Sequence, residues 1–224
     1  MLNRLTRTIA ITTLMSLVLV TLALVSFAPG ATRAQDETSD TDTQTDLKQV
    51  SIGDADAPVR IDEYASLTCS HCARFHNSVL PKLKELYIDT GKVQLIVHAS
   101  PFNKPALDAS MLVQCMPDNR SYNFMSLLFE NQEKWAQKDG YKQALKQNAR
   151  LAGMSNNKAD ECLGNTKLRK AIISNMQQAA KTLDISSTPT FILNNGKARI
   201  VGMRSVDVFA DKIDSLIDDA STGQ

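Results

Sequence analysis

The chain has 224 residues, which is enough for one domain of ordinary size together with shorter additional segments. Its formal net charge is +1, from 25 basic and 24 acidic residues, so the composition gives no electrostatic reason to expect binding to nucleic acid. It contains four cysteines, an even number that allows three different disulfide pairings.

The N-terminus predicts an export signal over residues 1–34. Arg4 and Arg7 form a basic start, an apolar run follows over 9–28, and small residues up to Ala34 fit a cleavage site. The apolar run is nearly long enough to cross a bilayer as a helix, so retention as an N-terminal membrane anchor is the alternative to cleavage. In either case we expect the folded part to be exported, to a compartment where disulfides persist.

Residues 35–48 are acidic, rich in hydroxyl side chains and almost free of apolar residues. Such a segment buries too little surface to offset the entropy that it would lose on ordering, so we expect a disordered linker. The folded domain is therefore predicted to cover residues 49–224.

The first part of this domain alternates between strand and helix patterns. The expected strands cover residues 50–52, 59–66 and 93–98. Between the second and third strands, apolar residues at helical spacing predict a helix that follows Cys72 and ends at Gly91. Pro81 falls inside this helix and predicts a kink about one turn before it.

The middle of the domain, about 103–185, shows helical spacing and no strand-like alternation. The expected helices cover 106–116, 122–135, 142–152 and 158–183. The remaining elements are two strands and a last helix, at 190–193, 199–201 and 206–217. Asn195 and Gly196 lie between the two strands and favour a tight hairpin turn. This order of elements predicts an α/β thioredoxin fold with an inserted all-helical domain.

Cys69 and Cys72 form a C-x-x-C pair at the junction of the second strand and the helix, a position typical of the thioredoxin-like redox motif. Unpaired backbone N–H groups and the positive end of the helix dipole favour a thiolate at Cys69, and the thiolate is the reactive form. We therefore expect Cys69 to be a redox nucleophile and Cys72 to resolve its mixed disulfides. A purely structural disulfide is the weaker alternative, because so small a ring constrains little chain.

Cys115 and Cys162 lie in separate predicted helices of the insertion. Because the C-x-x-C cysteines are already neighbours, the economical second disulfide joins Cys115 to Cys162. In the chain-entropy model this bond closes a loop of about 48 residues and stabilises the fold by roughly 4 kcal/mol. The alternatives are a second redox couple or zinc bound by the four cysteines, and a metal could also bind to Cys69, Cys72 and His76.

Three groups of residues carry a resemblance to a known family: Glu63-Tyr64-Ala65-Ser66, Cys69-Ser70-His71-Cys72-Ala73 with Phe75-His76, and Ser187-Thr188-Pro189-Thr190. On these residues the chain resembles, over about 50–222, the DsbA-like branch of the thioredoxin superfamily, the exported thiol-disulfide oxidoreductases of bacteria. The resemblance implies a periplasmic protein, either released or tethered to the inner membrane by residues 9–28. The dipeptide between the cysteines is Ser-His, where the best-known members have Pro-His.

The side chains around the cysteines are each expected to have a role. His71 would direct a hydrogen bond or partial positive charge toward the Cys69 sulfur, which lowers the thiol pKa and makes the disulfide more oxidising. Ser70 would tune the strength of this effect. Glu63 matches the buried acid of the family, which implies a proton relay for Cys72. A partly solvated acid at the strand end is the alternative for Glu63.

Pro189 stands where the family places a cis-proline beside the cysteines. The Thr188 backbone would then be free to pair with an extended substrate by strand addition. An ordinary trans proline at the start of a strand is the alternative. His76 and His98 are expected to be packing or surface residues.

The residues and the resemblance together predict an enzyme, an exported protein thiol:disulfide oxidoreductase that introduces disulfide bonds into other exported proteins. We expect no cofactor and no nucleic acid. The expected partners are exported proteins with free or mispaired cysteines and a membrane redox partner that resets the active-site disulfide. A periplasmic reductase or isomerase on the same scaffold is the nearest alternative, and a metal-handling thiol protein is another.

Overall fold

The computed structural model describes residues 46–136 and 139–222. The predicted export signal, 1–34, lies outside the described residues, as does the predicted linker, 35–48, except for its last three residues. None of the helices in the described part of the chain is both long and apolar enough to cross a bilayer.

The ordered domain begins slightly before residue 49. Leu47 is partly buried against the hydrophobic core. The backbone N–H of Lys48 donates to the side-chain oxygen of Gln114 at 3.0 Å, and the Gln114 amide donates back to the Lys48 carbonyl at 3.1 Å. These contacts attach the end of the predicted linker to the folded domain.

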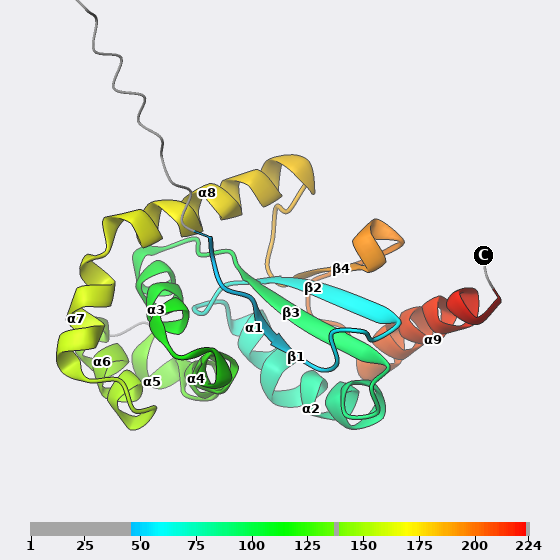
Figure 1. Ribbon diagram of the computed structural model, residues 1–224, viewed down its shortest axis with the longest axis horizontal. Helices are drawn as coiled ribbons and strands as arrows, with labels where there is room; N and C mark the ends of the chain where they lie inside the picture. The colour runs from blue at the N-terminus through cyan, green and yellow to red at the C-terminus, as the bar shows by residue number, and fades with distance from the viewer. Residues whose placement is uncertain (1–45, 137–138, 223–224) are drawn as a thin grey trace, which may run out of the picture. The chain divides into compact units, whose positions relative to one another are not determined.

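A five-stranded sheet with the order β1-β3-β2-β4-β5 forms the centre of the domain (Figure 1). The strands are β1 (Val50–Ile52), β2 (Val59–Ala65), β3 (Val93–Ala99), β4 (Thr190–Leu193) and β5 (Ala198–Val201). β2 and β3 are parallel, and the other neighbouring strands are antiparallel. The predicted α/β fold, in which a helical block separates two groups of strands, is confirmed.

The central strand β2 divides its side chains between the two faces of the sheet, because successive residues of a strand point in opposite directions. Ile61 and Ala65 belong to the main hydrophobic core, whereas Tyr64 belongs to a second, smaller cluster. Glu63 shares the face of Ile61 and Ala65 and pairs with Phe191 of β4 in the sheet register. The strand therefore places a carboxyl group inside the main core.

Figure 1 shows the helical segment after the C-x-x-C motif on one side of the sheet and α8 on the other. The segment consists of α1 (Ser70–Arg74), a π-helical turn (Phe75–Val79), α2 (Leu80–Leu83) and a second π-helical turn (Lys84–Ile88). Leu80 N–H donates to the carbonyl of Phe75, five residues earlier. The chain thus accommodates Pro81, which lacks an N–H, with a widened turn at the place where a kink was predicted.

β4 and β5 form the predicted hairpin, but their connection is longer than a tight turn. Residues 194–197 join the two strands. The side chain of Asn194 accepts from the Arg60 N–H at 2.7 Å and donates to the Pro58 carbonyl at 3.2 Å. The longer loop therefore ties the hairpin to the start of β2.

The helical insertion is confirmed, with more helix ends than predicted. Its helices are α3 (Lys104–Cys115), α4 (Asp118–Glu130), α5 (Gln132–Trp135), α6 (Tyr141–Leu151), α7 (Asn156–Gly164) and α8 (Thr166–Thr182). The predicted helices 122–135 and 158–183 are each divided in two, at Asn131 and Asn165. The Asn165 side chain accepts from the Leu168 N–H at 3.0 Å and so caps α8.

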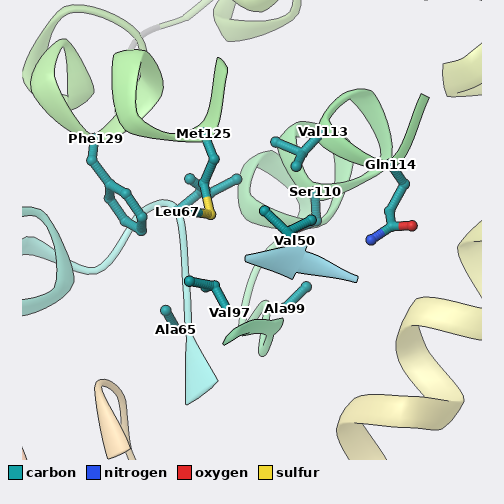
Figure 2. A pocket seen from close by; sticks show the side chains of 10 residues that line it. All are labelled: Val50, Ala65, Leu67, Val97, Ala99, Ser110, Val113, Gln114, Met125 and Phe129. Atoms are coloured by element: carbon teal, nitrogen blue, oxygen red, sulfur yellow. The ribbon is translucent and has the colours of Figure 1, made fainter. Parts of the chain in front are cut away.

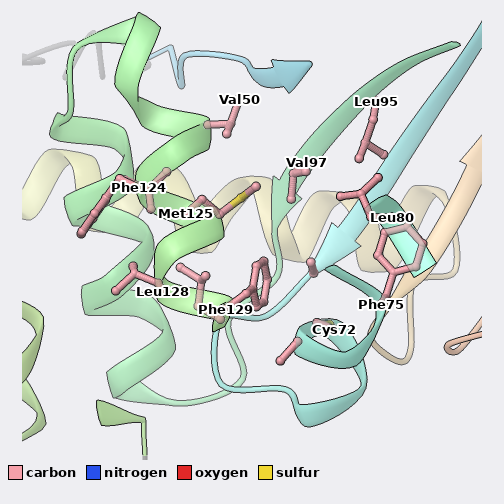
Figure 3. Close-up of a cluster of buried hydrophobic side chains, with 14 of the residues drawn as sticks. Val50, Cys72, Phe75, Leu80, Leu95, Val97, Phe124, Met125, Leu128 and Phe129 are labelled. Carbon is pink, nitrogen blue, oxygen red and sulfur yellow. The ribbon is translucent and has the colours of Figure 1, made fainter. Parts of the chain in front are cut away.

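The insertion and the sheet share one hydrophobic core. Figure 3 shows Phe129 and Met125 on the side of α4 that faces Val97 of β3 and the helix that carries Cys72. On the sheet side, α9 (Val206–Thr222) adds Phe209, whose ring lies 5.3 Å from that of Phe75 between centroids. The residues around the active site are therefore packed from both parts of the domain.

Candidate active site

Cys69 occupies the N-cap position of α1, directly after the loop that leaves β2. Its backbone N–H donates to the carbonyl of Ser66 at 3.0 Å, and its own carbonyl accepts from the Ala73 N–H at 3.1 Å. The first helical N–H groups have no partner within the helix, so they point toward the N-cap side chain. The local backbone thus places the Cys69 sulfur where a negative charge is stabilised.

The electrostatics at Cys69 favour the thiolate. The pKa of its thiol is lowered from 9.0 to about 5, chiefly by a hydrogen bond from the Cys72 thiol, then by a hydrogen bond with Thr188 and by the backbone N–H groups of Cys72 and His71. Burial opposes this shift, since only 9% of Cys69 is exposed. Cys69 is therefore largely ionised at neutral pH, as a nucleophile requires.

Cys72 has the opposite character. It is completely buried, and its pKa is raised by burial, by its hydrogen bond to Cys69 and by the charge of Glu63. Both cysteines are free thiols in this structure. The pair therefore combines a reactive sulfur at the helix end with a second sulfur that is held as a thiol beneath it.

The His71 side chain differs from its predicted role. It is exposed, and its Nδ1 atom accepts a hydrogen bond from the Arg74 guanidinium at 2.8 Å. What His71 supplies to Cys69 is its backbone N–H. Ser70 is exposed at the first position of α1. The helix geometry explains the difference, because a side chain two residues after the N-cap points outward while its N–H points toward the cap.

The loop before β4 closes the other side of Cys69. The Thr188–Pro189 peptide bond is cis, and the Thr188 carbonyl oxygen lies 3.4 Å from the Cys69 sulfur. The Pro189 carbonyl accepts from the Gly202 N–H at 2.8 Å, which fixes the loop to the chain after β5. The structure thus brings Cys69, Thr188 and Pro189 together, although more than a hundred residues separate the first from the others.

Glu63 lies inside the core beneath the cysteines and has a partner that the sequence did not reveal. Its carboxylate oxygens lie 2.9 and 3.2 Å from Nε2 of His76, and both side chains are buried. The expectation that His76 is a packing or surface residue missed this contact. The signal that could have identified it is spacing, because His76 follows Cys72 by one helical turn and shares its face.

Gln132 is a second residue of the site that the sequence did not reveal. Its side-chain amide donates to the carbonyls of Leu67 and Cys69, at 2.9 and 3.0 Å. Gln132 belongs to α5 of the insertion and is buried. These bonds connect the insertion directly to the active-site loop, and no local sequence pattern indicates a contact over such a separation.

Cys115 and Cys162 form a disulfide that joins α3 to α7, with a Cα–Cα distance of 6.2 Å. Both cysteines thus belong to the helical insertion, apart from the C-x-x-C pair. Their positions on two different helices of one block suit a structural bond.

The described residues hold no group of side chains arranged for a metal ion, and a small cavity lies beside the sheet. Among residues 46–136 and 139–222, no three His, Cys, Asp or Glu side chains are arranged to hold a metal ion. A cavity of about 30 Å³ lies between the sheet and helices α3 and α4, lined mostly by aliphatic side chains (Figure 2). It has room for a water molecule or two and is too small for an organic substrate.

The fold and the C-x-x-C site define a protein of the thioredoxin class. Comparison with known proteins shows to which branch of this class the chain belongs. A family model described as thioredoxin matches residues 45–218. The crystal structure of α-DsbA1 from Wolbachia pipientis is 30% identical, has a TM-score of 0.71, and is matched over 80% of this chain and 96% of that chain. The chain therefore belongs to the thioredoxin family and, within it, to the DsbA-like proteins.

Other relatives agree with this placement. A Rickettsia typhi protein named as a protein-disulfide oxidoreductase is 31% identical over 176 residues, which are 78% of this chain and 63% of that protein. The chain thus spans less than two thirds of the length of this relative. BdbD from Bacillus subtilis is 22% identical with a TM-score of 0.69, over 78% of this chain and 96% of that chain, and is similar in fold.

Proposed function

We propose that this protein is an exported thiol-disulfide oxidoreductase that introduces disulfide bonds into other exported proteins. The observation that carries the proposal is the asymmetry between its two cysteines. Cys69 has a lowered thiol pKa and lies against the Thr188 carbonyl, whereas Cys72 is buried with a raised pKa. Such a pair presents one sulfur to another protein and keeps the second for the intramolecular step.

In the oxidising direction two electrons pass from the substrate to the cysteine pair. A substrate thiolate attacks the sulfur of Cys69 in the active-site disulfide, the Cys69–Cys72 bond breaks, and Cys72 leaves and takes up a proton. A second substrate thiolate then attacks the first substrate sulfur, and Cys69 leaves as a thiolate. The substrate gains a disulfide and loses two protons, one to Cys72 and one to solvent.

The neighbouring residues serve the two steps differently. Glu63 is the proposed acid and base for Cys72, since it is the buried carboxyl whose charge acts on that sulfur. The Thr188–Pro189 backbone is the proposed docking edge for an extended substrate chain, because it borders Cys69 and precedes a strand.

The lowered pKa of Cys69 favours oxidation of the substrate over its reduction. A stabilised thiolate stabilises the reduced form of the pair, and a pair whose reduced form is stable is a strong oxidant. The protein then requires an oxidising partner to restore its disulfide after each cycle. We place that partner in the membrane and the protein in the periplasm, in keeping with the export signal predicted over residues 1–34.

Trapping of the mixed disulfide tests this proposal. When the two-cysteine peptide is supplied as its disulfide, the Cys69 thiolate of the Cys72→Ala variant attacks one peptide sulfur and the other leaves as a thiolate. The variant should accumulate this mixed disulfide, because Cys72 is absent and cannot attack it. The Cys69→Ala variant should form no such complex, and the oxidised wild-type protein should convert the reduced peptide to its disulfide in one turnover. Equal complex formation by both variants, or no peptide oxidation by the wild type, would contradict the proposal.

A further inference from the structure

Glu63 makes a buried contact with His76. The family resemblance assigns a role to Glu63 and none to this histidine. A carboxylate in an apolar core is unfavourable unless it carries a proton or faces a positive charge. Glu63 is 0% exposed and meets one imidazole nitrogen with both of its oxygens. The other nitrogen of His76, Nδ1, is buried and has no hydrogen-bond partner in the described part of the chain.

The His76 ring is fixed in this orientation by aromatic neighbours from two elements. It stacks on Phe129 of α4, with centroids 4.1 Å apart and planes at 19°, and meets the edge of Phe75 at 5.4 Å. Turning the ring over would break the bond from Nε2 to Glu63. The aromatic contacts therefore set the plane of the ring, and the bond to Glu63 sets which nitrogen faces the carboxylate.

This arrangement gives the pair two levels of protonation. With Nε2–H directed at Glu63, the neutral ring donates a hydrogen bond but leaves the carboxylate charge uncompensated. A second proton, on Nδ1 or on the carboxylate, makes the pair neutral overall. The unpartnered Nδ1 is thus an open position for a proton inside the core, one helical turn from Cys72.

We propose that Glu63 and His76 form one proton-storing unit that delivers a proton to Cys72 when its sulfur leaves and recovers that proton when the sulfur attacks. The inference rests on the proposed thiol exchange and extends it to His76. Glu63 exchanges the proton with Cys72, and His76 is a positioning residue that acts through Glu63. In the attacking direction the Cys72 S–H bond breaks, a bond forms to the sulfur of Cys69, and the substrate leaves as a thiolate.

Few other titratable groups face this unit. Cys72 interacts with it from α1, and Tyr122 interacts with it from α4, where burial and then the Glu63 charge raise the tyrosine pKa. The histidine–carboxylate pair His98–Asp62, at 2.6 Å, lies on the opposite face of β2. That second pair lies away from the cysteines and differs in that His98 is partly exposed and Asp62 is also bound by Arg60, so it is a control for the loss of a carboxylate-bound histidine elsewhere in the fold.

The test measures the rate of the step in which the Cys72 sulfur attacks a mixed disulfide at Cys69. Oxidised glutathione is added to reduced protein to form a mixed disulfide at Cys69, and the release of glutathione is followed by stopped flow as a function of pH. His76→Gln keeps a hydrogen bond to Glu63 but cannot hold the extra proton. We expect about tenfold slower release in this variant, a part of the hundredfold or more typical of general acid–base catalysis, because Glu63 remains.

The pH profile separates this role from simple packing. His76→Gln should lose one ionisation that the wild type shows, whereas His98→Gln should keep the wild-type rate and profile. Glu63→Gln combined with His76→Gln should be no slower than Glu63→Gln alone, because the two residues act as one unit. A His76→Gln profile like that of the wild type, or equal effects of both histidine variants, would overturn the inference.

A measurement on the wild-type protein covers the case in which His76→Gln does not fold. Nitrogen NMR of the imidazole should show Nε2 protonated throughout and Nδ1 protonated to different extents in the oxidised and reduced forms. Identical nitrogen shifts in both forms at every pH would overturn the inference. If the wild type forms no mixed disulfide at all, the proposed function fails instead, so the two failures are distinguishable.

Discussion

The reactivity of Cys69 depends on donors that converge at one helix end. The Cys72 thiol and the backbone N–H groups of His71 and Cys72 all point at its sulfur, and together they outweigh the burial that favours the neutral thiol. The same donors are lost when the chain unfolds. The charge on Cys69 is therefore linked to the stability of the reduced protein.

The stability of the reduced protein should rise with pH through the neutral range. The folded pKa of Cys69, about 5, lies below its unfolded value, so its stabilisation is fully present above the unfolded pKa and is lost as pH falls through 5. Between about pH 5 and 8 the slope should approach about 1.4 kcal/mol per pH unit relative to Cys69→Ala. Urea unfolding of both reduced proteins measures this, and parallel curves would contradict it.

At the level of single residues, the sequence identifies the groups whose role follows from local geometry. Cys69 and Cys72 follow from the spacing at a strand–helix junction, and Glu63 follows from its match to the buried acid of the family. The ring of His71 was assigned the wrong contact, because its exposed orientation toward Arg74 is a side-chain choice that spacing does not determine. His76 was missed because its burial depends on α4, far away in the sequence.

Among the elements, the short helix α5 connects the helical insertion to the active-site loop. Gln132 at its start donates to two carbonyls of the loop that ends at Cys69. A buried carbonyl that loses its donor costs about 1–3 kcal/mol. The helical insertion therefore contributes to the geometry of the thioredoxin motif as well as to the core.

Replacement of Gln132 should disturb the active site from the insertion. In Gln132→Leu the Leu67 carbonyl loses this donor, while the Cys69 carbonyl keeps its bond from the Ala73 N–H. We therefore expect a loss of about 1–3 kcal/mol in the free energy of unfolding and a higher Cys69 pKa, because the loop relaxes at the helix end. Thiolate absorbance against pH measures the pKa. Gln147→Leu, on the exposed face of α6, is the matched control. An unchanged Cys69 pKa in Gln132→Leu would show that the contact is not needed to hold the site.

The order and type of the elements could be predicted from hydrophobic periodicity. The residues at which the helices begin and end could be predicted less accurately. The predicted helices 122–135 and 158–183 keep their apolar spacing across Asn131 and Asn165, so periodicity gave no sign of a break. The hairpin loop is longer than the Asn-Gly dipeptide suggests, because the side chain of Asn194 bonds to β2. Each difference comes from contacts between segments that are distant in the sequence.

At the scale of the described domain, the two cysteine pairs lie in different parts of the fold. The Cys115–Cys162 bond holds two helices of the insertion, and the C-x-x-C pair lies at the end of the sheet. The insertion shares its core with the sheet, so stability lost in one part lowers the stability of both.

Removal of the helical disulfide should therefore lower stability without abolishing thiol exchange. In Cys115→Ser combined with Cys162→Ser we expect a loss of roughly 4 kcal/mol, from the entropy of the opened loop, and peptide oxidation within a few-fold of the wild type. Urea unfolding and the peptide assay measure the two quantities on the same sample. Loss of all exchange in a variant that remains folded would assign this pair a redox role.

The equilibrium redox potential of the Cys69–Cys72 pair against glutathione decides whether the pair oxidises or reduces its substrates. A Cys69 pKa of about 5, against about 7 in thioredoxin, stabilises the reduced form at pH 7 by about 2.3 kcal/mol more, which corresponds to about 50 mV. We therefore predict a potential more oxidising than about −220 mV. A value at or below about −270 mV, that of thioredoxin, would contradict an oxidase and indicate a reductase.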